Sequence, residues 1–213
     1  MGHEELIEGL SQQLRKTPRH AIPFTIARTF VPGALLCFLL VLAVLGVRPD
    51  FHAAFLHVSF WMKWSYTLSM AGIGLYLCAL LARPVPSTPS RSWLVLVPVG
   101  LLAITAAAEL ARSPSRLWLV MLLGGSWKAC PLLVLLLSIP FFAALAFSFR
   151  SFAPTQLRAA GAAVGLAAST SGAVFYCLHC PEVSALFVLS WYSLGFATAA
   201  GAGAIVGPRI LRW

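Results

Sequence analysis

Long uninterrupted apolar stretches are the feature that most constrains the fold of this chain. A bilayer core is about 30 Å thick and takes roughly 20 apolar helical residues to cross. Because lipid offers no hydrogen-bond partners to the backbone, each crossing must be a helix that satisfies its own amides and carbonyls. We expect transmembrane helices at Thr29–Val47, Trp64–Ala82, Trp93–Ala111, Cys130–Phe149, Ala159–Leu178 and Glu182–Val206.

The composition excludes a water-soluble domain of this size. Of the 213 residues, 60% are hydrophobic and 10% are charged, so lipid must cover the excess apolar surface. The sequence therefore predicts an all-α polytopic membrane protein, with a six-helix bundle over residues 29–213 and a cytoplasmic tail over residues 1–28. Residues Leu117–Gly125 are also apolar, and they fit either an interfacial helix or an earlier start of the fourth span.

The basic residues predict the orientation, because lysine and arginine stay on the cytoplasmic side more often than they cross the membrane. With the N-terminus inside, ten basic residues lie inside: Arg15, Lys16, Arg19, Arg28, Arg83, Arg91, Arg150, Arg158, Arg209 and Arg212. Five lie outside: Arg48, Lys63, Arg112, Arg116 and Lys128. Both termini are therefore expected in the cytoplasm. The net charge of +9 reflects this topology, and we expect no direct binding of nucleic acid.

The predicted topology sorts the cysteines by depth. Cys37 and Cys78 fall within spans, where a free cysteine usually packs as a small hydrophobic residue. Cys130, Cys177 and Cys180 fall at the outer face of the membrane. The outer cysteines are therefore the candidates for chemistry.

Two of the outer cysteines share a local setting. Cys130 precedes Pro131 and Cys180 precedes Pro181, and each pair is predicted to open a helix that runs inward. The positive end of a helix dipole favours thiolate over thiol, which raises reactivity and metal affinity. Cys130 and Cys180 are therefore the two positions at which we expect chemistry.

Further donors lie on the same side of the membrane, namely His52, His57, His179 and Glu182. Thiolates with imidazole suit zinc, cadmium or copper(I), so Cys130 and Cys180, with His179 beside them, are candidate ligands of a transient soft metal ion. No resident cofactor is expected. In an oxidising compartment the two thiols could instead form a disulfide, and a purely structural disulfide or unpaired loop thiols stay equally open.

Two other functions fit parts of the outer face. Cys177 and Cys180 form a C-x-x-C pair, the spacing of thiol oxidoreductases, but no second pair or quinone site accompanies it. A small transporter would need ionisable relay groups at mid-membrane, and Glu109 and His179 are the plausible ones. We rank an enzyme and a transporter below a regulatory protein.

The first residues predict a short amphipathic helix that binds a partner. One helical stripe is apolar, formed by Leu6, Ile7, Leu10 and Leu14. Acidic residues come first, at Glu4, Glu5 and Glu8, and would be repelled by anionic lipid. A groove on a basic, DNA-binding protein therefore fits the tail better than a membrane surface.

Several motifs occur in a characteristic order along the chain. They are Ser126-Trp127-Lys128-Ala129-Cys130, Ala153-Pro154-Thr155, His179-Cys180-Pro181-Glu182, Trp191-Tyr192-Ser193-Leu194-Gly195 and the terminal Leu211-Arg212-Trp213. With the acidic tail and six spans, this pattern resembles the NrsF family over nearly the whole chain. Those proteins are bacterial inner-membrane anti-sigma factors that hold an extracytoplasmic-function sigma factor inactive.

The resemblance implies a division of labour between the two ends of the chain. The tail would sequester the sigma factor, and Cys130 and Cys180 would take part in sensing metal or oxidative stress. Cys177 is not part of the recognised pattern, so the resemblance assigns it no role. The tail also lacks the His and Cys spacing of zinc-binding anti-sigma domains.

Overall fold

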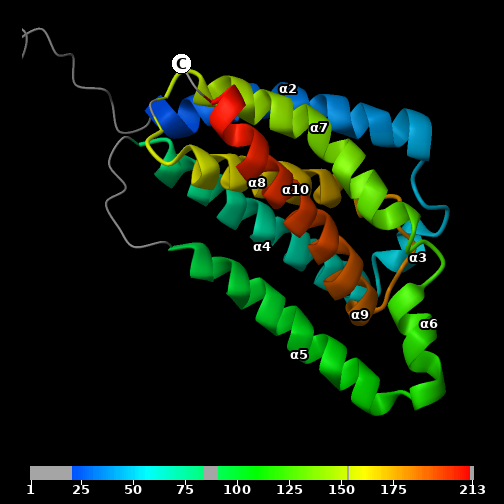
Figure 1. The fold of residues 1–213 in the computed structure, drawn as a ribbon. Coiled ribbons are helices and arrows are strands. Elements are labelled where there is room, and N and C mark those ends of the chain that lie inside the picture. Colours follow the sequence, from blue (N-terminus) through cyan, green and yellow to red (C-terminus); the bar gives the residue numbers. More distant parts are fainter. Residues whose placement is uncertain (1–20, 84–90, 153, 212–213) are drawn as a thin grey trace, which may run out of the picture.

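The computed structural model describes residues 21–83, 91–152 and 154–211, and every regular element in these ranges is a helix (Figure 1). Six helical segments are long and apolar enough to cross a membrane, which confirms the predicted fold class. The long helices are α2 (Ala21–Leu40), α4 (Val58–Leu81), α5 (Leu96–Arg112), α7 (Ala129–Phe149), α8 (Leu157–Tyr176) and α10 (Ser193–Ile210).

Short helical segments extend or connect the long ones. A π-helical turn continues α2 over Val41–Leu45, a 3-10 turn precedes α5 over Arg91–Val95, and a second π-helical turn precedes α10 over Val188–Tyr192. The connecting segments contain α3 (Phe51–Ala54), a 3-10 turn at Ser115–Leu117, α6 (Trp118–Leu123) and α9 (Ala185–Phe187).

The structure differs from the sequence prediction mainly at the ends of the spans. The first span begins at Ala21 and the second at Val58, so Lys63 lies inside a helix and not in the preceding loop. The sixth begins at Ala185, which leaves Glu182 outside it. The short helix α6 is separate from α7, because Gly124 ends it with a φ of 54°.

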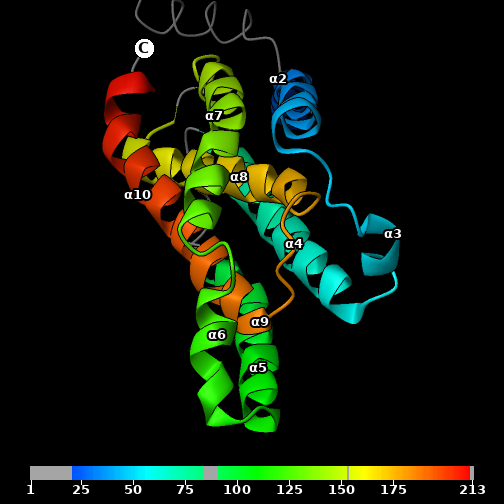
Figure 2. The same ribbon diagram turned by 90° about the vertical axis from the view of Figure 1, so that its right-hand side faces the viewer.

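Helix α8 is the centre of the bundle. It packs against α4, α7 and α10, while α2 packs mainly on α7 and α5 lies at the edge (Figures 1 and 2). Small residues allow the close contact: a Cβ added to Gly161 would lie 2.2 Å from the carbonyl oxygen of Gly203, and one added to Gly165 would lie equally close to Ala199. The fifth and sixth membrane helices are therefore in close backbone contact through their glycine faces.

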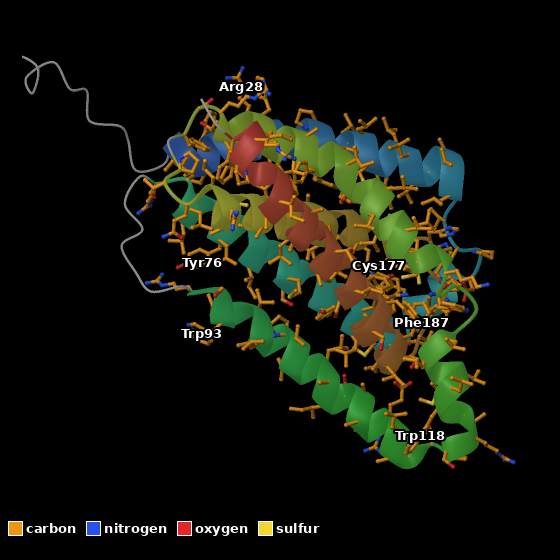
Figure 3. The ribbon with its side chains drawn as sticks, in the orientation of Figure 1. Arg28, Tyr76, Trp93, Trp118, Cys177 and Phe187 are labelled. Atoms are coloured by element: carbon orange, nitrogen blue, oxygen red, sulfur yellow. The ribbon has the colours of Figure 1, made fainter. Side chains whose placement is uncertain are left out.

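Successive long helices run in alternate directions, so the connections between them lie at two opposite ends of the bundle. One end contains six arginines and no acidic residue among the described residues: Arg28, Arg83, Arg91, Arg150, Arg158 and Arg209. The other end contains the connections from α2 to α4, from α5 to α7 and from α8 to α10. Figure 3 shows Arg28 near the first end and Cys177 toward the second, which we call the cysteine end.

Candidate functional site

The junction segment, residues 177–184, connects α8 to α9 at the cysteine end. Its first residues still follow the helix, since the amide of Cys180 donates to the carbonyl of Tyr176 at 3.0 Å. From Cys180 onward the backbone is not helical, and Ser184 is the N-cap residue of α9. The prediction that Cys180 and Pro181 open a helix is therefore wrong, because the chain first crosses the end of the bundle in a non-helical conformation.

The three cysteines at this end are buried. Cys130 lies in the first turn of α7, next to the N-cap residue Lys128, and its side chain is 0% exposed. Cys177 and Cys180 are also 0% exposed. The three thiols are therefore shielded from water and from soluble reagents in this arrangement.

The fold nevertheless gathers these cysteines, although Cys130 is distant from the others in sequence. The Tyr176 hydroxyl lies within interaction range of the thiols of Cys130 and Cys180, and Cys177 lies in electrostatic range of both. We call Cys130, Cys177 and Cys180 the thiol cluster. All three are free thiols, so the described residues contain no resting disulfide.

Cys177 is the member of the thiol cluster to which the family resemblance assigned no role, and the sequence analysis used it only in the alternative C-x-x-C oxidoreductase. The Thr67 hydroxyl lies 3.8 Å from its sulfur, and the buried Tyr192 ring lies beside the cluster. The sequence signal that could have placed Cys177 in the thiol cluster is its position three residues before Cys180, at the end of a helix. By contrast Cys37 and Cys78 are buried along the spans, as predicted for packing residues.

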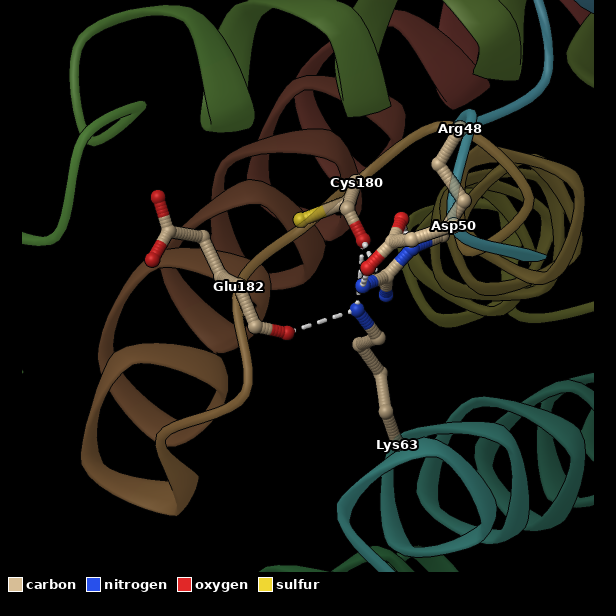
Figure 4. Close-up of polar contacts among 5 residues, drawn as sticks. All are labelled: Arg48, Asp50, Lys63, Cys180 and Glu182. Carbon is tan, nitrogen blue, oxygen red and sulfur yellow. Dashed lines mark hydrogen bonds and ion pairs between the residues drawn. The ribbon is translucent and has the colours of Figure 1, made fainter. Parts of the chain in front are cut away.

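Lys63 is the charged residue that contacts the junction segment most directly. Its ammonium donates to the carbonyl oxygens of Cys180 and Glu182, each at 2.8 Å (Figure 4). The side chain is 1% exposed and forms no ion pair with an acidic residue in the described part of the chain. Sequence reasoning had counted Lys63 only as an outer charge, because it placed the residue outside the span.

Arg48 supports the same segment from the connection after α2. Its guanidinium donates to both carboxylate oxygens of Asp50, at 2.7 and 2.6 Å, and lies 3.5 Å from the Cys180 carbonyl oxygen. Its amide donates to the carbonyl of Leu178 at 3.1 Å. The hydrogen bonds from Arg48 hold the pKa of the Asp50 carboxyl below its usual value, so this ion pair persists at neutral pH.

Two carboxylates fix the junction segment to its other neighbours. Glu182 accepts hydrogen bonds from the amides of Gly125 and Ser126, at 2.8 and 3.1 Å, and from the Ser126 hydroxyl at 3.0 Å. Glu109 of α5 accepts from the Ser184 hydroxyl at 3.2 Å and from the amide that begins α9 at 2.7 Å. The carboxylates therefore satisfy backbone donors at a turn and at a helix start.

The histidines do not complete a metal site. Nδ1 of His179 lies 3.1 Å from the carbonyl oxygen of Gly46. Among the residues that the structure describes, no three Cys, His, Asp or Glu side chains are arranged to hold a metal ion. Binding of a soft metal by Cys130 and Cys180 stays a prediction.

The predicted partner-binding residues lie outside the described residues. They are Glu4, Glu5, Leu6, Ile7, Glu8, Leu10 and Leu14. Their helical stripe and their role stay predictions from the sequence.

Comparison with known proteins identifies the family. The family model described as "NrsF: Negative regulator of sigma F" matches residues 10–213. A probable anti-sigma-F factor NrsF of Azospira oryzae is 40% identical over 182 residues, which are 85% of each chain. The anti-sigma-F factor NrsF of Caulobacter vibrioides is 34% identical over 216 residues, covering both chains fully. No solved structure matches. The family model matches almost the whole chain, and the six apolar helices and the ordered motifs agree with this match. The chain therefore belongs to the NrsF family.

Proposed function

We propose that this protein holds an extracytoplasmic-function sigma factor at the bacterial inner membrane and releases it when metal or oxidative stress acts on Cys130 and Cys180. Membership of the NrsF family carries the coarser statement, that the chain is a negative regulator of a sigma factor. The membrane bundle supports the anchoring role, since six of its helices can cross a bilayer.

Sigma-factor binding is assigned to the tail, residues 1–28. The apolar stripe of Leu6, Ile7 and Leu10 in the tail supports this assignment, although the family match, which begins at residue 10, includes only Leu10 of the three. A short amphipathic helix is marginal in water alone and orders when its apolar side is covered. A groove on the sigma factor would supply that cover.

The tail is tested by changing Leu6, Ile7 and Leu10 together to serine in the full-length protein. The variant should reach the membrane at the normal level, yet no longer co-purify with the sigma factor, because the apolar contact is lost. The matched control changes Gln12 and Gln13 to serine, which leaves the stripe intact. Retained co-purification in the triple variant contradicts the assignment.

Sensing is assigned to the thiol cluster, and its resting geometry supports a switch. The thiols of Cys130, Cys177 and Cys180 lie together in the protein interior. Within the described residues they form neither a disulfide nor a metal site of three or more ligands. A ligand or an oxidant that draws two of them together would favour a different arrangement of α7 and the junction segment. Differential affinity for two arrangements is what a ligand-driven change requires.

The sensing role is tested with Cys130→Ala combined with Cys180→Ala. We expect a sigma-dependent reporter to stay repressed and to lose its induction by cadmium or by a thiol oxidant. Cys37→Ala combined with Cys78→Ala is the control, because those cysteines lie outside the thiol cluster. Full induction in the first double variant would reduce Cys130 and Cys180 to packing residues.

The geometry favours neither alternative function. A C-x-x-C oxidoreductase needs an accessible thiolate, whereas Cys177 and Cys180 are both fully buried. A relay would need free ionisable groups, whereas Glu109 caps α9 and His179 contacts the Gly46 carbonyl. These contacts support a structural role for both residues.

A further inference from the structure

The junction segment is contacted from four other parts of the chain. Arg48 approaches it from the connection after α2, and Lys63 approaches it from α4. Glu109 reaches it from α5, while Glu182 of the segment itself contacts the turn between α6 and α7. The position of Cys180 is therefore set by contacts with many elements and not by a helix of its own.

Lys63 differs from the other contacts in its environment. Arg48 has Asp50 as an ionic partner, whereas Lys63 is buried and donates its hydrogen bonds to two backbone carbonyls. The carboxylate of Glu182 points away from it, toward the turn at Gly125 (Figure 4). An ionisable residue inside a membrane helix is costly and usually serves a function.

The two carbonyls that Lys63 binds flank Pro181. Lys63 binds the main-chain oxygens of Cys180 and Glu182, so its ammonium fixes the backbone of the segment directly. Proline cannot donate an amide hydrogen bond, so the segment has few ways to fix itself here. Loss of the ammonium would leave two carbonyls without their donor next to the thiol cluster.

We propose that Lys63 is the positioning residue of the thiol cluster: its ammonium holds the Cys180–Glu182 backbone in the resting arrangement, and loss of this contact moves the protein toward the sigma-releasing state. Only the movement toward the sigma-releasing state rests on the proposed function. The contact of Lys63 with the Cys180–Glu182 backbone is tested through the exposure of Cys180 and needs no sigma factor.

The test uses full-length Lys63→Met in cells, with labelling of Cys180 by a membrane-impermeant maleimide and mass spectrometry of the labelled peptide. Methionine keeps the apolar stem but removes all donors. We expect the labelling rate of Cys180 to rise about tenfold or more, because hydrogen bonds from a charged group are lost. Lys63→Arg keeps the charge and the donors and should restore the low rate.

The matched control is Lys128→Met at the same end of the bundle. Lys128 is exposed, and its ammonium lies over the Trp127 ring, 5.2 Å from the ring centroid. Its loss should leave Cys180 labelling unchanged. Lys63→Gln, which keeps an N–H donor without the charge, is a milder second variant. Unchanged labelling in both neutral Lys63 variants, at matched membrane level, overturns the inference.

A sigma-dependent reporter, measured without stress in the same strains, separates the two clauses. A parallel rise of labelling and reporter activity in Lys63→Met, reversed in Lys63→Arg, supports the whole proposal. Raised labelling with full repression supports the positioning role and contradicts the proposed coupling between the thiol cluster and the tail. Failure of the double cysteine variant to lose induction contradicts thiol sensing and leaves the labelling result unaffected.

Discussion

Carboxylates are rare in this chain, and each one outside the tail stabilises the same place. The sequence has six acidic residues, of which Glu4, Glu5 and Glu8 belong to the tail. Glu182 belongs to the junction segment, Glu109 contacts it, and Asp50 binds Arg48, which touches it. Single side chains therefore determine the geometry of the cysteine end, whereas apolar contacts determine the rest of the bundle.

Gly124 is a residue where one methyl group should matter. Its φ is 54°, a conformation that other residues rarely adopt, and an added Cβ would lie 2.6 Å from a carboxylate oxygen of Glu182. We predict that Gly124→Ala destabilises the protein by about 1–3 kcal/mol, seen as a lower thermal unfolding temperature of the purified protein in detergent.

Gly100→Ala is the control for this substitution. Gly100 lies within α5, and an added Cβ meets nothing within 4 Å. Alanine there should be neutral or slightly stabilising, because it favours the helix. Equal effects of the two substitutions would show that neither the backbone conformation nor the Glu182 contact matters at Gly124.

The residue types of the site were predictable, but several of its contacts were not. Cys130 and Cys180 were selected because each precedes a proline, and the fold does bring them to one place. The contacts of Lys63 and Arg48 with the junction segment were missed, because both go to backbone carbonyls distant in sequence. A hydrogen bond to a backbone carbonyl leaves no signature in residue type at the accepting position.

At the scale of elements, α8 carries the bundle because its residues are small. Gly161, Gly165 and the alanines between them let α10 approach closely, and Gly74 of α4 meets Ala167 in the same way. Gly72 of the same helix is different, because an added Cβ there meets nothing within 4 Å. Small residues thus mark close helix contacts where they face a neighbouring helix, as Gly74 does against α8, and not where they face away from it.

A pair of glycines in α10 tests this contact. A Cβ at Gly203 would lie 2.2 Å from the carbonyl oxygen of Gly161, whereas a Cβ at Gly201 meets nothing within 4 Å. We predict that Gly203→Ala forces α8 and α10 apart and costs about 1–3 kcal/mol. The fraction of protein that stays soluble in detergent after heating measures the effect, and Gly201→Ala should behave like the unchanged protein.

The spans were predictable from apolar runs, and their ends were less so. The third and fourth predicted spans agree closely with the structure, since charged residues end their apolar runs. The sixth was placed too early because Pro181 suits a first helical turn. Instead, Lys63, Arg48 and Glu182 hold the chain before α9 in a non-helical path, and these tertiary contacts override the local preference.

For the whole molecule, the distribution of arginines predicts the orientation. The six described arginines at one end should face the cytoplasm, so the cysteine end should face the periplasm. Single cysteines introduced at Ser115 and Ser151, in a chain whose own cysteines are replaced by alanine, report this directly. Both positions are exposed, and they lie at opposite ends of the bundle.

An impermeant maleimide should label the cysteine at Ser115 in cells with a permeabilised outer membrane, and label the one at Ser151 only after the inner membrane is also opened. Labelling in the reverse order would invert the topology. It would place the thiol cluster in the cytoplasm, beside the tail.

The junction segment also bears on how a signal can pass through the bundle. Its anchors come from the connection after α2, from α4, from α5 and from the turn before α7, so displacing Cys180 disturbs several helices at once. Packed interfaces of this kind shift between discrete arrangements and do not deform continuously. Each molecule should therefore be either fully holding or fully releasing, and a graded response in the cell would reflect the proportion of molecules in each condition.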